Sequence, residues 1–292
     1  MAEASIPVDV LNPGQVFACL GLMEAAEILC GSSEGCFAYK GTESSVDFLL
    51  RADGAQDPVM ETLRFFRSAH AQAIAPRNSK LSTRKWDLET LQRPDARFPC
   101  PTPESPAALP AILKNEKYSI AIEHWADGSD RDNVKFWAGL QGKPGAALAG
   151  DALNLVRGFD DSALAAAAKD PFNVSAPQSS SFRFDWRRDY IPLDAGFSPN
   201  EHRSMTMVGY PLVELLAAIG MQNARPQRLD VRNPLVYRYG VSSAKLPTAF
   251  ARVVLGGESL GFPFRLFRMR LGWPGQEGQA RCIVDAQEEL VP

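Results

Sequence analysis

Residues 12–29 constrain the fold more than any other part of the sequence. Asn12 is typical of a helix N-cap, because its side-chain oxygen can accept a bond from a free backbone N–H. Pro13 suits the first helical position, where its missing N–H costs nothing. The following residues are apolar on nearly every side, which predicts a helix buried inside the protein. Glu24 and Glu27 interrupt the run before it reaches the roughly 18 uncharged residues of a membrane span.

This buried helix is not expected to be a targeting segment. No basic region precedes it, and no short apolar stretch ends in a small-residue cleavage site, so the sequence does not predict a signal peptide. The 5 cysteines are odd in number and lack C-x-x-C spacing, which favours a reduced, cytoplasmic setting. Only 3 histidines occur, far apart, so we expect neither a zinc site nor any other cofactor.

Composition and element spacing predict an irregular α+β fold, with a mostly antiparallel sheet and packed helices. A chain of 292 residues, 45% of them hydrophobic, can bury a substantial core as one body or as two subdomains. Strand and helix patterns alternate without a regular βαβ rhythm. Residues 171–181 have the composition of a linker and separate an N-terminal α+β region (1–171) from a C-terminal α+β region (182–292) with arginine-rich strands.

Individual elements follow from capping and periodicity. Residues 36–51 read as a hairpin, and Asp57-Pro58 begins a helix expected to run to about residue 73. Residues 77–110 are basic and broken by prolines, which predicts a long loop without a regular element. Alternation of aromatic and charged residues predicts a half-exposed strand over 182–187. The remaining expected elements are helices at 146–157, 162–169 and 211–221, and strands at 118–125, 235–241, 264–271 and 280–286.

The sequence offers little support for catalysis. It contains no phosphate-binding G-x-x-x-x-G-K-[ST] loop, no G-x-S-x-G elbow, no H-E-x-x-H pair and no zinc-deaminase signature. The acidic pairs Asp160-Asp161 and Glu288-Glu289 are expected to be solvated surface carboxylates. We therefore predict a protein without catalytic residues; the weaker alternative is a metal-independent hydrolase using His124 or His202.

Arginine placement is the positive signal, although a net charge of −3 gives no overall field that would attract nucleic acid. Arginine's planar fork suits phosphate, and neighbouring aromatics such as Trp186, Tyr237 and Tyr239 can stack on bases. One face of a strand at 264–271 would carry apolar residues and then Arg268 and Arg270. For each arginine the alternative is an ion pair with a carboxylate. The candidate nucleic-acid contacts are Lys80, Arg84, Lys85, Arg183, Arg187, Arg188, Arg225, Arg228, Arg232, Arg238, Arg265, Arg268 and Arg270.

Three segments, and a shorter fourth, carry a resemblance to a known family. They are residues 12–21 (NPGQVFACLG), 193–200 (LDAGFSPN), 210–220 (YPLVELLAAIG) and 135–139 (KFWAG). They resemble subunits encoded with type I-U (also called I-G) CRISPR–Cas systems, in the family given the large-subunit-like role of the effector complex, Cascade. None of these segments is a catalytic motif.

The resemblance implies a non-catalytic subunit of a crRNA-guided surveillance complex in the cytoplasm, with no membrane partner. Its implied partners are other Cascade subunits, crRNA, target double-stranded DNA and a helicase-nuclease. In such complexes base pairing reads the sequence, while protein contributes backbone contacts and recognition of the adjacent motif. The chain is short for a large subunit, which leaves open a backbone or accessory subunit that binds only other proteins.

Overall fold

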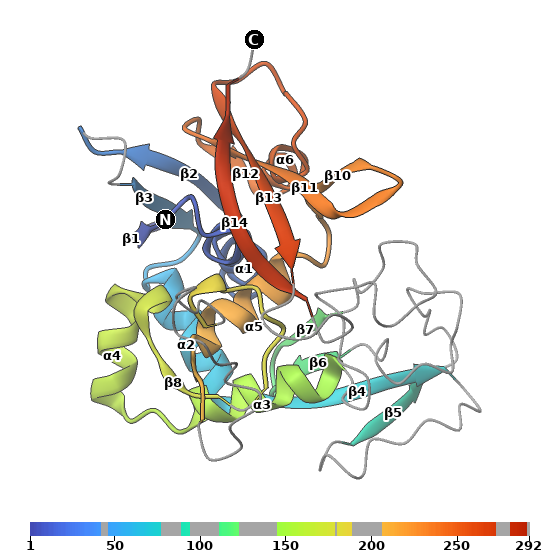
Figure 1. Cartoon of the computed structure of the whole chain (residues 1–292). Coiled ribbons are helices and arrows are strands. Elements are labelled where there is room, and N and C mark those ends of the chain that lie inside the picture. The colour runs from blue at the N-terminus through green and yellow to red at the C-terminus, as the bar shows by residue number, and fades with distance from the viewer. Residues whose placement is uncertain are drawn as a thin grey trace.

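A computed structural model describes residues 1–41, 46–76, 89–93, 111–122, 145–178, 180–188, 206–272 and 281–290. Within these residues the chain has an irregular α+β fold whose sheets are mostly antiparallel, as the sequence predicts. The C-terminal sheet occupies the upper part of the molecule in Figure 1, and α2, α3 and α4 the lower part, with α5 between them.

Helices α1 and α2 begin at the caps that the sequence predicts. Asn12 Oδ1 accepts the Gly14 N–H at 3.2 Å, and Asp57 Oδ1 accepts the Val59 N–H at 2.8 Å. The described helices are α1 (Pro13–Cys30), α2 (Pro58–Ser68), α3 (Gly145–Arg157), α4 (Asp161–Lys169), α5 (Pro211–Gly220) and α6 (Thr248–Leu255).

The described strands form four sheets. The first has the order β1 (Ala2–Val8), β3 (Val46–Ala52), β2 (Ser33–Tyr39) and β12 (Leu246–Pro247). The C-terminal sheet has the order β10 (Gln227–Asp230), β11 (Asn233–Ser242), β13 (Phe264–Gly272) and β14 (Cys282–Glu289). The third has the order β5 (Thr90–Arg93), β4 (His70–Pro76), β6 (Ala111–Lys114) and β7 (Ser119–Ile122), and a short fourth pairs β8 (Ala176–Pro177) with β9 (Val208–Gly209).

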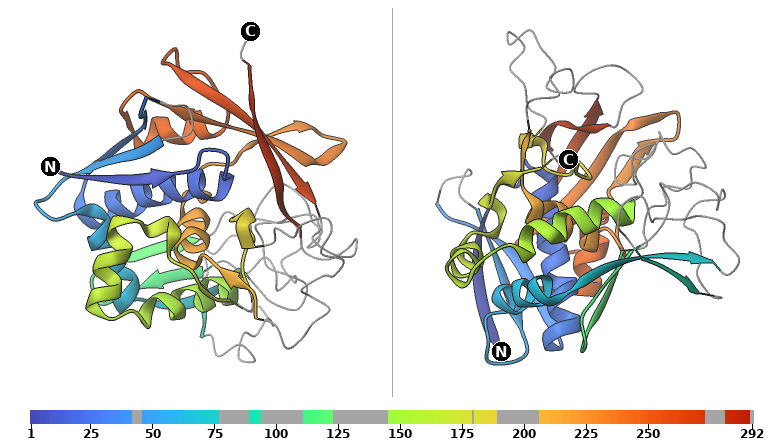
Figure 2. Two further views of the ribbon diagram at one scale, coloured as in Figure 1. Left: turned by 60° about the vertical axis from the view of Figure 1, so that its left-hand side comes forward. Right: turned by 90° about the horizontal axis from the view of Figure 1, so that it is seen from below.

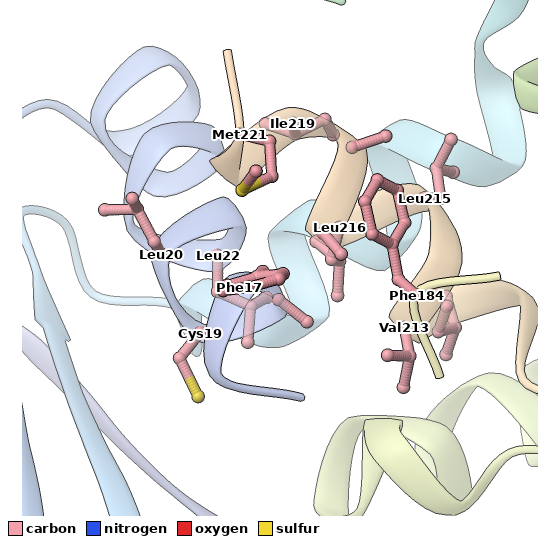
Figure 3. Packing of buried hydrophobic residues seen from close by; sticks show 14 of the residues in the cluster. Phe17, Cys19, Leu20, Leu22, Phe184, Val213, Leu215, Leu216, Ile219 and Met221 are labelled. Carbon is pink, nitrogen blue, oxygen red and sulfur yellow. The ribbon is translucent and has the colours of Figure 1, made fainter. Parts of the chain in front are cut away.

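The centre of the protein is the crossing of α1 and α5, where glycines allow the two backbones to touch. A Cβ built on Gly21 would lie 1.9 Å from the carbonyl oxygen of Leu216, and one on Gly220 would lie 2.2 Å from that of Phe17. Neither position therefore has room for a side chain. Figure 3 shows Phe17, Leu216 and Phe184 gathered at this crossing.

Helix α1 is a core helix. By length and composition it could cross a membrane, yet 78% of its 18-residue window is buried inside the protein. The first sheet packs along one side of it (Figure 2, left). This burial is compatible with a soluble protein. It agrees with the expectation that the helix is buried in the protein core and not in a lipid bilayer.

One core joins the two regions predicted from composition. The ring of Phe17 meets Phe184 edge-on at 6.4 Å and Tyr239 at 5.9 Å, and Tyr239 stacks on Phe267 at 5.4 Å. The Tyr239 hydroxyl donates to the carbonyl of Val10 at 2.9 Å. Residues from both sides of the predicted linker thus share one hydrophobic cluster.

Two predictions for residues 57–110 are wrong in part. The helix after Asp57 ends at Ser68, because Ala69 adopts an extended backbone and residues 70–76 form β4 instead. Residues 90–93 form β5, inside a segment expected to lack any regular element. Strand β5 pairs in parallel with β4, a long-range partner that the local sequence does not reveal. Residues 77–88 and 94–110 lie outside the described residues.

The half-exposed strand predicted at 182–187 is absent from the described structure. Arg183 has a φ of 64°, a left-handed conformation that interrupts an extended chain, and residues 186–188 form a short 3-10 helix. Phe182 and Phe184 both enter the core, while Asp185 is also fully buried. The linker-like residues 171–181 contain a further 3-10 turn at Pro171–Asn173 as well as β8.

Candidate nucleic-acid interface

The C-terminal sheet separates buried from solvent-facing residues on β13 by strand periodicity. Phe267, Met269 and Leu271 face the core, whereas Arg268 and Arg270 alternate with them and are exposed. The predicted face of this strand, apolar at one end and basic at the other, is confirmed. Because opposite residues in a ladder share a side, the register places Arg238 of β11 and Gln287 of β14 on either side of Arg268.

We call this solvent-facing surface the outer face; it consists of Arg238, Arg268, Arg270, Asp285, Gln287 and Glu289. Two of its arginines pair with carboxylates of β14. Arg270 Nη2 lies 2.7 Å from Asp285 Oδ2, and Arg238 Nε lies 2.5 Å from Glu289 Oε2. Arg268 forms no ion pair with any residue that the structure describes. It is therefore the outer-face arginine most open to an external anion.

Arg265 belongs to the opposite face and is occupied by the fold. Its guanidinium donates to Glu288 Oε1 at 2.5 Å and lies 4.6 Å from the centre of the Tyr39 ring. The hydrogen bond from Arg265 lowers the pKa of Glu288 below its usual value and correspondingly raises that of Arg265. The paired Arg265 is a poor candidate for a nucleic-acid contact.

Three predicted arginines lie in or beside the β10–β11 hairpin. Arg225 and Arg232 are exposed to solvent, one before and one after β10. Arg228 donates to the carbonyls of Asp230 and Val231 at 3.1 and 2.5 Å, so it stabilises the turn. Tyr237 and Tyr239 are buried in the core, so the expectation that they stack on bases is wrong.

The cluster around Trp186 is largely buried. Arg183 and Arg188 are buried, and Arg188 Nη2 donates to the carbonyl of Gln178 at 3.3 Å. Arg187 binds Asp185 through two nitrogens, with Nη2 2.6 Å from Oδ2, and its guanidinium lies 3.5 Å from the centre of the Tyr210 ring. Arg183 and Arg188 are too deeply buried to contact nucleic acid, so that interpretation of them is wrong. Arg187 is 24% exposed, but its internal partners make it a poor candidate.

A buried polar cluster, which the sequence reading missed, organises this region. Asp185 accepts a bond from Asn12 Nδ2 at 3.0 Å, so the N-cap of α1 is tied to the 182–188 segment. Glu214 of α5, fully buried, accepts the backbone N–H groups of Asp185 at 3.0 Å and Phe184 at 3.3 Å. The sequence does contain one indication of this cluster, a lone glutamate inside the apolar run 211–220. A carboxylate that is buried with such a helix requires hydrogen-bond partners.

We expect Glu214→Gln to flatten the pH dependence of stability between about pH 4.5 and 7. Burial, with a smaller contribution from the nearby Asp185 carboxylate, raises the pKa of Glu214 from 4.5 to about 7, although the backbone N–H bonds and Arg188 act to lower it. In this range the native state keeps a proton that the unfolded chain has released. The group's contribution is thus full below pH 4.5 and declines by about 3 kcal/mol as pH rises to 7.

Urea unfolding followed by circular dichroism at pH 5 and pH 8 measures this difference. The control is Glu258→Gln, which changes an exposed carboxyl. Glu258→Gln should keep the pH dependence of the unmodified chain. If Glu214→Gln keeps it as well, the proton on Glu214 does not contribute to stability.

The other predicted residues could not be placed. Lys80, Arg84 and Lys85 lie outside the described residues, as do His124 and His202 of the hydrolase alternative. Within the described ranges, no group of three or more histidine, cysteine, aspartate or glutamate side chains is arranged to hold a metal ion.

Compared with models of protein families, with curated proteins and with solved structures, the chain gives no match.

Proposed function

We propose that this chain is a non-catalytic subunit of a crRNA-guided surveillance complex and that it contacts nucleic acid through the outer face. The observation that carries the proposal is Arg268, an exposed arginine in the middle of β13 with no carboxylate partner among the described residues. Arg238 and Arg270 flank it on the same face. A guanidinium held on a strand suits a phosphate oxygen of a nucleic-acid backbone.

The family resemblance supports the proposal through residues 12–21 and 210–220. These segments form most of the first three turns of α1 and all of α5, and they meet through Gly21 and Gly220. Residues 135–139 and 193–200 lie outside the described residues. A family that kept this crossing would need small residues at the same two points.

The acidic net charge of −3 fits a subunit that works inside an assembly. A few local arginines would contact crRNA or target DNA, while other Cascade subunits would supply the remaining positive charge. In this proposal the subunit contributes to holding target double-stranded DNA, to recognition of the adjacent motif and to recruitment of the helicase-nuclease. It works in the cytoplasm with no membrane partner.

Reversing the charge of Arg268 and Arg270 together is expected to weaken binding of crRNA or target duplex by roughly tenfold or more at low salt, because two carboxylates then replace two cations and repel phosphate. The measurement is binding of labelled target duplex by the assembled complex. The matched control is Arg64→Glu with Arg67→Glu, two partly exposed, ion-paired arginines on α2. Unchanged affinity, or an equal loss in the control, would contradict the proposal; the unfolding temperature should not change.

A second candidate function is a protein-interaction subunit of the same or another complex, with no nucleic-acid contact. It is favoured by exposed apolar side chains on and after α6, namely Phe250, Val253 and Phe262. Isolated exposed apolar residues are ordinary on a protein surface, so this observation is weaker than the exposed arginine. In that role, charge reversal of Arg268 and Arg270 would leave nucleic-acid binding unchanged while the chain still assembles with its partners.

A further inference from the structure

Basic and acidic side chains lie side by side on the outer face, in a pattern set by strand register. Strand β14, at the sheet edge, places Asp285 opposite Arg270 and the neutral Gln287 opposite Arg268. Glu289 lies two residues beyond Gln287, opposite Leu266, and reaches Arg238 of β11. Arg238 of β11 and Arg270 of β13 therefore each pair with a carboxylate of β14, whereas Arg268 of β13 does not.

The Arg270–Asp285 pair is open to water, and the Arg238–Glu289 pair is partly exposed. The side chains of Arg270 and Asp285 are 62% and 48% exposed, and those of Arg238 and Glu289 are 32% and 22% exposed. Water screens charges at such positions, so an exposed ion pair holds its members only weakly. A phosphate group offers arginine a comparable bidentate partner and can replace a carboxylate there.

The ion pair of Arg265 with Glu288 provides a contrast within the same sheet. It lies on the other face, and the Arg265 guanidinium is also placed over the Tyr39 ring. Exchange with an external anion would remove both contacts. The Arg265–Glu288 pair is about as exposed as the Arg238–Glu289 pair, so the difference is the Tyr39 ring, a second partner that Arg238 and Arg270 lack among the described residues.

We propose that Asp285 and Glu289 act as internal competitors for nucleic-acid phosphate at the outer face. This inference rests on the proposed function and adds a form of regulation to the same site. In the free chain, Asp285 and Glu289 occupy Arg270 and Arg238 and repel a phosphate approaching Arg268. The free chain therefore binds nucleic acid weakly, and the site fills only when other subunits hold the backbone beside it.

The ligand of this site is the sugar–phosphate backbone, not the bases. The described aromatic residues opposite and beside the arginines, Tyr237, Tyr239 and Phe267, are buried on the core side of the sheet. Phe264 of β13 shares the outer face, but it is half-buried and is separated from Arg268 by Leu266; no described aromatic ring of β11 or β14 accompanies the arginines there as a stacking platform. Binding should accordingly depend on salt and little on sequence.

The test is the double variant Asp285→Asn with Glu289→Gln, made in the full chain. Fluorescence anisotropy with labelled single-stranded DNA, and with a labelled duplex, is measured over a range of salt concentrations. Freeing two arginines and removing two repelling charges should raise affinity roughly tenfold at low salt. The slope of log affinity against log salt should steepen by about 1.5 to 2, because two more phosphates are contacted.

The matched control is Glu61→Gln with Asp161→Asn. It changes the net charge by the same amount and frees Arg64 and Arg67 on α2, away from the sheet. A rise in affinity for the β14 variant alone, lost again when Arg268→Glu is added, supports internal competition. No rise, or an equal rise in the control, overturns it.

Failure of this inference can be told apart from failure of the proposed function. If Arg268→Glu weakens binding by the unmodified chain but the β14 variant binds no more tightly, the nucleic-acid contact stands and internal competition falls. If neither change affects binding by the free chain or by the assembled complex, both fall.

Discussion

Replacing Gly21 by alanine is expected to lower the free energy of unfolding by more than about 3 kcal/mol. The new methyl would lie 1.9 Å from the Leu216 carbonyl oxygen, so α1 and α5 must move apart. Separation would also open the contacts around Phe17 and Leu216 seen in Figure 3. The better helix propensity of alanine offsets about 1 kcal/mol of this loss at most.

Urea unfolding followed by far-UV circular dichroism measures this effect. The control is Gly158→Ala, where the nearest atom to an added Cβ is the Leu155 carbonyl oxygen at 3.4 Å, an ordinary contact. A loss for Gly21→Ala no greater than that for Gly158→Ala would show that the two helices are not in direct backbone contact.

Replacing Asp185 by alanine should destabilise the protein by about 4 kcal/mol, because it breaks a buried charge pair by removing one partner. Asp185 is fully buried and accepts bonds from both Asn12 and Arg187. Its loss leaves the Arg187 guanidinium with only Phe172 and Asn173 as hydrogen-bond acceptors among the described residues. The N-cap of α1 loses its tie to the 182–188 segment at the same time.

The matched comparison is Asp161→Asn, which breaks an ion pair with Arg67 at a side chain that is 92% exposed. That change should have little effect on stability, because water screens an ion pair at such an exposed position. Thermal unfolding at one fixed pH compares the two variants. Equal shifts in the unfolding temperature would mean that Asp185 has no special role in joining α1 to the 182–188 segment.

Elements with strong local signals could be predicted from the sequence. Asn12, Pro13 and an apolar run sufficed for α1, and a similar run sufficed for α5. Period-two alternation located β13 and the outward position of Arg268 and Arg270. These signals work because capping and amphipathic burial depend on residues only a few positions apart.

Predictions failed where the deciding partner is distant in sequence. Strand β5 exists because β4 pairs with it, and the 182–188 segment is irregular because Asn12 and Glu214 bind it from two helices. Sequence alone also could not show which arginines have carboxylate partners. Arg238 meets Glu289, 51 positions away, whereas Arg268 meets the neutral Gln287.

The segments that carry the family resemblance and the arginines that carry the proposed function have different physical roles. Residues 12–21 and 210–220 are constrained by the close approach of two backbones. The outer face has no such constraint, since its side chains extend into solvent. In our account the first set preserves the fold, while the second provides the contact with nucleic acid.

The most direct test of the central claim is to purify the tagged chain from cells that also express a CRISPR array and the candidate partner subunits. RNA in the purified sample is then sequenced and quantified relative to protein. Our account predicts that crRNA and other subunits co-purify with the chain, and that the complex with Arg268→Glu and Arg270→Glu assembles but retains less target duplex. A chain that purifies without partner subunits and without crRNA would contradict it.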